Sequence, residues 1–73
     1  MPEEVRPATI RLADALRAEI AADLGLTELP HRRDIAMQYG LAQATVAQVL
    51  RALAAEGLIE AQPGGGWTVA GRL

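Results

Sequence analysis

Hydrophobic residues recur along residues 9–24 at steps of three and four. This spacing gathers them on one face of an α-helix, while most of the residues between them are polar. Gly25 follows the last of them and is suited to ending a helix. The pattern predicts a first helix from Thr9 to about Gly25, whose apolar face is formed by Ile10, Ala13, Leu16, Ile20 and Leu24.

A second, shorter helix is predicted over about Arg32 to Tyr39. Pro30 is suited to the entry of a helix, and Gly40 is suited to its end. The residues expected on its buried face are Ile35, Ala36 and part of Tyr39.

A third helix is predicted from about Gln43 to Glu56, after a three-residue connection. It ends at Gly57, because glycine adopts the left-handed conformation at little cost. One inward face is expected from Val46, Val49, Leu50 and Leu53. Two helices joined by a short turn with a glycine have the spacing of a helix-turn-helix.

Two short strands are predicted after the third helix, over 58–61 and 67–70. They flank a turn-rich tip at 62–66 that holds one proline and three glycines. Three helices followed by a β-hairpin predict a mainly α fold, the winged helix-turn-helix. We expect this domain to cover residues 9–73, preceded by a flexible arm at residues 1–8.

Composition excludes several classes of protein. The chain has 73 residues, no Cys and one His, which excludes disulfides and Cys-based zinc sites and most His-centred catalytic sets. There is no phosphate loop and no nucleophile paired with a base, so we expect no enzyme, cofactor or metal. No apolar run approaches the roughly 20 residues that cross a bilayer, and a cytoplasmic location is expected.

Charge is distributed unevenly along the chain. The formal net charge is −2. Residues 31–53 nevertheless hold three arginines against one aspartate and form the only segment with a net positive charge. Because phosphate neutralisation supplies much of the affinity for DNA, a helix-turn-helix is where this charge is expected in a DNA-binding domain.

Four stretches of sequence, in order, resemble the DNA-binding domain of the gluconate-repressor (GntR) family of bacterial regulators. Residues 29–36 (LPHRRDIA) resemble the opening of the family's second helix. Thr45-Val46 and residues 50–59 (LRALAAEGLI) resemble its third helix and exit, and residues 64–69 (GGGWTV) are similar to its wing. The resemblance implies a transcriptional regulator that binds double-stranded DNA as a dimer. It also implies that effector binding belongs to a larger C-terminal domain, so no effector site is expected within this chain.

The sequence departs from the family at several positions that are usually polar or cationic. His31 stands where the family usually has Ser, Ala42-Gln43 where it has Ser-Arg, and Ala47 where an Arg is common. Gly65 occupies a wing tip that is often basic. These departures keep a second hypothesis open, a winged helix that binds protein instead of DNA.

The candidate DNA contacts lie in the second helix, the third helix and the wing. They are Arg32, Arg33, Gln43, Ala44, Thr45, Ala47, Gln48, Arg51 and Gly65. The resemblance assigns Arg33 to the backbone or a guanine edge and Thr45 to a phosphate. The face of the third helix opposite its apolar residues is predicted to hold Gln43, Ala44, Ala47, Gln48 and Arg51. Gln can pair with adenine and Ala can contact the thymine methyl group, so this outward face favours A·T pairs. Each residue also has an ordinary structural interpretation, as a solvated or helix-favouring side chain. Trp67 is expected to anchor the wing on the core, and His31 is not among the expected contacts.

Overall fold

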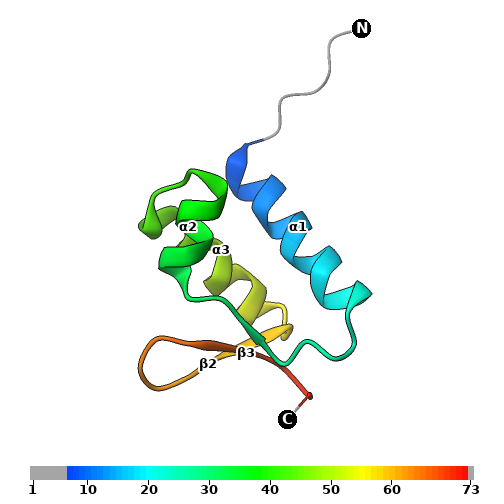
Figure 1. Cartoon of the computed structure of the whole chain (residues 1–73). Coiled ribbons are helices and arrows are strands. Elements are labelled where there is room, and N and C mark those ends of the chain that lie inside the picture. The colour runs from blue at the N-terminus through cyan, green and yellow to red at the C-terminus, as the bar shows by residue number, and fades with distance from the viewer. Residues whose placement is uncertain (1–6, 73) are drawn as a thin grey trace, which may run out of the picture.

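The computed structural model describes residues 7–72, which form three helices and a small three-stranded sheet (Figure 1). The elements in chain order are α1 (Ala8–Ala22), β1 (Glu28–Leu29), α2 (Arg32–Tyr39), α3 (Gln43–Ala55), β2 (Ile59–Ala61) and β3 (Trp67–Val69). This arrangement confirms the predicted winged helix-turn-helix. The predicted arm lies mostly outside the described residues, but Pro7 is the N-cap of α1 and Ala8 already belongs to that helix.

Helix α1 buries a different stripe from the one its sequence predicted. Leu12, Leu16 and Ile20 are the buried residues, at steps of four. The predicted stripe was wrong at both ends, because Ile10 is 39% exposed and Leu24 is 78% exposed. The buried stripe of α1, including Leu12, belongs to the same core cluster as the buried residues of α3.

The end of α1 also differs from the prediction. The helix ends at Ala22, three residues before Gly25, with Asp23 as its C-cap in an extended conformation. The Asp23 carboxylate accepts a hydrogen bond from the Gly25 amide at 3.0 Å. The guanidinium of Arg72 donates to the carbonyl oxygens of Ile20 at 2.9 Å and of Asp23 at 2.8 Å. These bonds satisfy carbonyl groups that a helix end leaves without partners.

Helices α2 and α3 confirm the bounds that their sequence predicted to within one residue. Gly40 caps α2 in the left-handed conformation, with φ 67°. Gly57, with φ 83°, follows α3 and its amide donates to the carbonyl of Ala54. Both turns need a positive φ, which glycine adopts without steric cost.

The sheet has the strand order β1-β3-β2, with both pairs antiparallel. The wing hairpin, β2 and β3, confirms the predicted hairpin. Strand β1 was missed, because its two residues were interpreted as a connector between helices. Leu29 lies opposite Trp67 in the ladder, so β1 forms only when a strand nearly forty residues later pairs with it.

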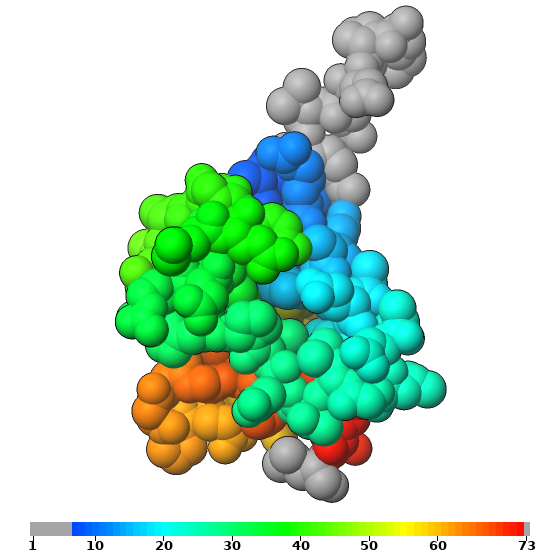
Figure 2. Space-filling view, in the orientation of Figure 1, coloured from blue at the N-terminus to red at the C-terminus, as the bar shows by residue number. Residues whose placement is uncertain are grey.

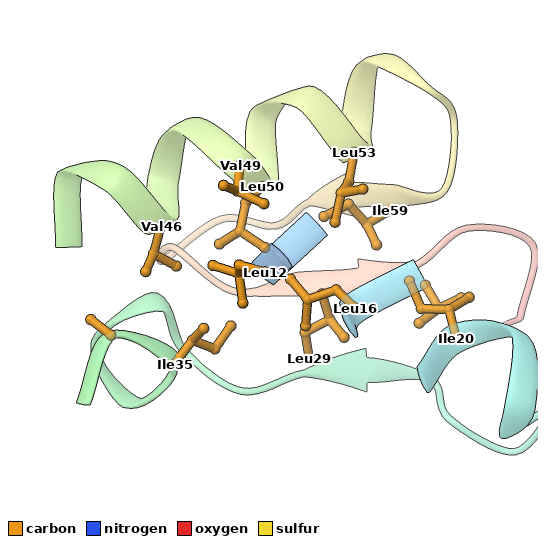
Figure 3. Packing of buried hydrophobic residues seen from close by; sticks show 12 residues of the cluster. Leu12, Leu16, Ile20, Leu29, Ile35, Val46, Val49, Leu50, Leu53 and Ile59 are labelled. Carbon is orange, nitrogen blue, oxygen red and sulfur yellow. The ribbon is translucent and has the colours of Figure 1, made fainter. Parts of the chain in front are cut away.

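The core lies between α1, α3 and the sheet (Figure 3). Its largest fully buried side chains are Leu12, Leu16, Ile35, Val46, Leu50, Leu53, Ile59 and Val69. Every predicted inward residue of α3 is among the buried residues of that helix. Trp67 is partly buried and packs against this cluster, which confirms its expected role as the anchor of the wing.

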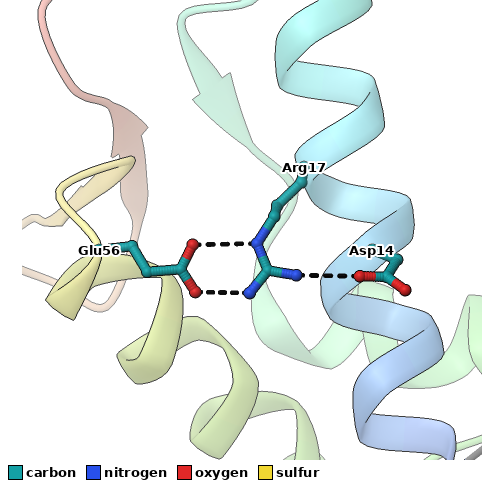
Figure 4. Close-up of polar contacts among 3 residues, drawn as sticks. All are labelled: Asp14, Arg17 and Glu56. Carbon is teal, nitrogen blue, oxygen red and sulfur yellow. Dashed lines mark hydrogen bonds and ion pairs between the residues drawn. The ribbon is translucent and has the colours of Figure 1, made fainter.

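A pair of charged contacts fastens α1 to the C-terminal end of α3 (Figure 4). Arg17 donates from Nε to one carboxylate oxygen of Glu56 at 2.9 Å, and from a terminal nitrogen to the other oxygen. A second terminal nitrogen bonds Asp14 at 3.0 Å. The hydrogen bonds with Arg17 lower the pKa of the Glu56 carboxyl below its ordinary value, and those with Glu56 raise the pKa of Arg17. We call these three residues the α1–α3 clamp.

Candidate nucleic-acid interface

The start of α2 is fixed by a histidine side chain. His31 is the N-cap residue, and its ring nitrogen Nδ1 accepts a hydrogen bond from the backbone amide of Arg33 at 3.1 Å. This contact satisfies one of the amide groups that the first turn of a helix leaves free. Arg32 and Arg33 follow at once, so both guanidinium groups are presented, exposed, from the first turn of α2.

The predicted contacts on α3 are divided among three sides of that helix. Gln43 and Ala44 are exposed in its first turn, and Thr45 is half-buried beside them. Gln48 is exposed, but it lies in a groove between α1 and α3 together with Ile10 and Arg17. The prediction of one shared outward face was therefore wrong for Gln48, which faces α1.

Ala47 was also expected on the outward face, and that placement was wrong. It is buried, with 7% of its surface exposed. The reason is the wing, which packs over this side of α3 and which the helical pattern alone does not reveal. Ala47 lines a groove beside the wing. Its role as a DNA contact remains a prediction.

A groove of about 250 Å³ lies between the start of α2, the middle of α3 and the wing. We call it the wing groove. Its lining residues are His31, Arg32, Ala47, Arg51, Ala61, Gln62, Gly64, Gly65, Gly66 and Trp67. In Figure 2 the orange residues of the wing lie directly below the green residues of α2, on the same side of the molecule. The structure thus brings together four of the predicted contacts, namely Arg32, Ala47, Arg51 and Gly65.

The tip of the wing is closed by its own backbone. The amide of Gln62 donates to the carbonyl of Gly66 at 2.8 Å, and the amide of Gly65 donates to the carbonyl of Gln62 at 3.1 Å. Gly65 has a φ of 93°, a conformation that other residues rarely adopt. The tip therefore carries no side chain where it faces His31.

The charges of this surface are all available to a partner. Within residues 7–72, Arg32, Arg33 and Arg51 form no ion pair and donate no side-chain hydrogen bond. The carboxylate nearest along the chain to Arg32 and Arg33 is Asp34, in the first turn of α2. Two unpaired guanidinium groups, those of Arg32 and Arg51, line the wing groove, and Arg33 is exposed beside Arg32. Guanidinium groups attract anions and match the geometry of carboxylate and phosphate.

His31 was not among the residues expected to contact DNA, and the structure gives it a capping role. A lone histidine is a weak signal, but its position was informative, because the related family usually places a capping Ser there. The Nδ1 atom of His31 performs the same task as a serine hydroxyl oxygen at an N-cap. The described part of the chain contains no group of His, Cys, Asp and Glu side chains that is placed to hold a metal ion. Nor does it contain a helix with the length and hydrophobicity to cross a membrane.

The chain matches a known family of proteins over most of its length. Residues 8–69 match the family described as bacterial regulatory proteins, gntR family. The chain belongs to the gntR family. The match begins at the first residue of α1 and ends at the last residue of β3, so it covers all the elements that form the wing groove. The gntR family is a family of regulators and not of enzymes. A comparison with curated protein sequences found no match.

Solved structures share the fold of this gntR-family domain. A crystal structure of AraR(DBD) in complex with operator ORE1 has a TM-score of 0.85 and 22% identity, covering 96% of this chain and 88% of the other. A structure of the mutant ORR3 in complex with the NTD of AraR has a TM-score of 0.85 and 23% identity, covering 93% and 100%. A transcriptional regulator from Oenococcus oeni has a TM-score of 0.80 and 30% identity, covering 97% of this chain and 61% of its own.

Proposed function

We propose that this gntR-family domain binds double-stranded DNA in a sequence-specific manner and thereby regulates transcription. The observation that carries the proposal is the set of three unpaired arginines around the start of α2, α3 and the wing. Two of the similar structures are of AraR domains, one of them bound to an operator. This likeness supports DNA binding here, and we expect the first turns of α3 to lie in the major groove and the wing at the adjacent minor groove.

The cationic residues supply contacts to the DNA backbone. Arg32 and Arg51 line the wing groove, where a phosphate strand that passes between α3 and the wing lies within their reach. Arg33 is exposed beside Arg32 and contacts the backbone or a guanine edge. The half-buried hydroxyl of Thr45 in the first turn of α3 adds a neutral phosphate contact.

Base recognition falls to the start of α3. Gln43 and Ala44 are exposed there, and these residue types match adenine and the thymine methyl group. Gln48 lies on the side of α3 that faces α1. We therefore expect it to reach only bases on that side of the helix, away from those that Gln43 and Ala44 contact. We therefore expect an A·T-rich half-site, read by few side chains, with Gly65 allowing the wing backbone to approach the minor groove.

Two copies on a two-fold operator provide the affinity that one copy lacks. Three arginines per copy give six in a dimer, and if all of them contact phosphate the log-log salt slope is about −5. A regulator of this kind blocks or recruits the transcription machinery by occupying its site. The proposal includes the dimer because protein two-fold symmetry and operator symmetry accompany one another.

Selection of bound sites from a random duplex library tests the proposal. The recovered site is then titrated at about 50 and 200 mM salt, a range over which phosphate contacts lose much of their affinity. We expect an inverted repeat with A·T-rich half-sites and affinity that falls steeply with salt. A folded chain that enriches no site at either salt concentration would contradict the proposal and favour the alternative, a winged helix that binds protein.

A further inference from the structure

His31 has a hydrogen-bonding state that the structure determines. Its Nδ1 atom accepts from the backbone amide of Arg33, so Nδ1 carries no proton. A neutral imidazole has one protonated nitrogen, and here that nitrogen is therefore Nε2. Protonation of the whole ring would place an N–H group against the Arg33 amide and break the cap of α2.

The Nε2–H group of His31 is directed at the wing. A Cβ atom at Gly65 would lie 3.6 Å from Nε2, which puts the ring edge beside the tip of the wing. Within residues 7–72, Nε2 has no hydrogen-bond acceptor. The side chain is half-buried and lines the wing groove together with Arg32 and Arg51. The charged side chains that line this groove, Arg32 and Arg51, are both cations, and no carboxylate is among the lining residues.

In the proposed orientation on DNA, the backbone of one strand passes the wing groove. Helix α3 is on one side of it and the wing is on the other. If α3 enters the major groove and the wing enters the minor groove, the strand between these two grooves crosses the wing groove. An oxygen of that strand would then meet two guanidinium groups and one imidazole N–H.

We propose that the wing groove holds one backbone phosphate of bound DNA and that His31 contacts it through Nε2–H as a neutral imidazole. This inference rests on the proposed DNA binding. It assigns His31 two tasks, since Nδ1 caps α2 and Nε2 donates to the phosphate. Gly65 leaves the mouth of the groove open, because any side chain at this positive φ would be strained and would stand beside Nε2.

The substitution His31→Ser separates the two tasks. Serine is a good N-cap residue, so α2 keeps its cap, whereas the donor toward the wing is removed. A neutral hydrogen bond contributes modestly, and we expect affinity for a short random-sequence duplex at low salt to fall about three- to tenfold. Because the lost donor is uncharged, the salt slope should remain that of the unsubstituted chain. The matched control is Arg32→Gln, which lowers the affinity and also reduces the slope.

The sole histidine of the chain makes a direct measurement possible in the unsubstituted protein. Nitrogen-15 spectra of the imidazole should show Nδ1 unprotonated and Nε2 protonated. On addition of the duplex, the Nε2–H proton should shift and exchange more slowly with water, while Nδ1 stays unprotonated. This experiment remains informative even if His31→Ser fails to fold.

The outcomes distinguish this inference from the function on which it rests. If the unsubstituted chain binds no duplex, the proposed function fails and this inference fails with it. If the chain binds duplex while Nε2–H is unchanged and His31→Ser binds equally well, DNA binding stands and the assignment of His31 is overturned. A gain of a proton at Nδ1 on binding would also overturn it, because the contact would then be made by an imidazolium that no longer caps α2.

Discussion

Two regions of this small domain use arginine in opposite ways. On the side of the α1–α3 clamp, Arg17 bonds both oxygens of Glu56, and Arg72 donates to backbone carbonyls at the end of α1. Around the wing groove, Arg32 and Arg51 have no partner within residues 7–72. Arginine that the fold satisfies stabilises the fold, whereas arginine that it leaves unpaired is available to another molecule.

This difference explains how an acidic chain can still present a cationic surface. The formal net charge is −2, yet three exposed or groove-lining arginines without partners within residues 7–72, Arg32, Arg33 and Arg51, lie at the start of α2 and on the wing side of α3. In the α1–α3 clamp, Asp14 and Glu56 are both paired with Arg17. Glu56 lies at the C-terminal end of α3, whereas Gln43 and Ala44 lie at its N-terminal end. Net charge is therefore a poor guide here, because binding depends on which charges remain unpaired and where they lie.

The largest expected effect is on DNA binding and comes from Arg33→Ala. Loss of an arginine that contacts the backbone or a guanine edge should weaken binding by about 1–3 kcal/mol, or roughly five- to 150-fold. The melting temperature should stay the same, because the exposed Arg33 side chain forms no hydrogen bond or ion pair within the described residues. The matched control is Arg11→Ala, which removes the same charge from the exposed surface of α1. Equal loss of affinity in both variants would mean that only overall charge matters.

Arg72→Ala should lower the stability of the fold and leave DNA binding unchanged, which is the reverse of the result expected for Arg33→Ala. Its guanidinium donates to three carbonyl oxygens, those of Ile20, Asp23 and Leu26, and hydrogen bonds to a charged group contribute more than neutral ones. We expect a loss of about 1–3 kcal/mol in the free energy of unfolding, visible as a lower thermal midpoint. DNA affinity, measured well below that midpoint, should be unchanged. Arg72→Ala would break the comparison if it weakened DNA binding as much as Arg33→Ala does.

A smaller effect is expected for Arg51→Gln, which tests the wing groove. Removing one phosphate contact should reduce the magnitude of the log-log salt slope by about one unit for each copy of the chain bound. Binding should weaken by a similar factor for every DNA sequence, because a phosphate contact carries no sequence information. A change in the preferred site without a change in slope would instead make Arg51 a base-reading residue.

The smallest effect is a pH dependence of the clamp. Arg17 lowers the pKa of Glu56 in the folded chain below the ordinary value of 4.5. The stabilisation by this contact is therefore complete above that value and is lost as the pH falls through the lower, folded-state pKa. The difference in melting temperature between the unsubstituted chain and Glu56→Gln should be small at neutral pH and should disappear under acid conditions. A difference that grows on acidification would contradict this assignment.

The sequence predicted those parts of the molecule that local chemistry determines. Helices α2 and α3 follow from their apolar spacing and from Gly40 and Gly57, which can adopt the left-handed conformation that ends each helix. The end of α1 could not be predicted, because Arg72 satisfies its carbonyl groups from 49 residues beyond Asp23. Strand β1 was missed for the same reason, since its partner β3 lies far along the chain.

The candidate site was predicted as a set of residues but not as an arrangement. A helical wheel gives the side of α3 that faces the core, and it cannot show which of the other sides the wing covers. Ala47 is therefore buried below the wing and Gln48 faces α1, although both were expected on one outward face. The capping role of His31 was not predicted, because it depends on the hydrogen bond that Nδ1 accepts from the Arg33 amide.

The most direct test of the account is a titration of the nitrogen-15-labelled chain with the duplex recovered by selection, followed through its backbone amide signals. We predict that the amides that shift belong to the start of α2, the first turns of α3 and the wing tip, and that those around Arg17 and Arg72 stay in place. Shifts confined to the groove between α1 and α3, or no shift at saturating duplex, would contradict the claim that the unpaired arginines form a DNA-binding surface.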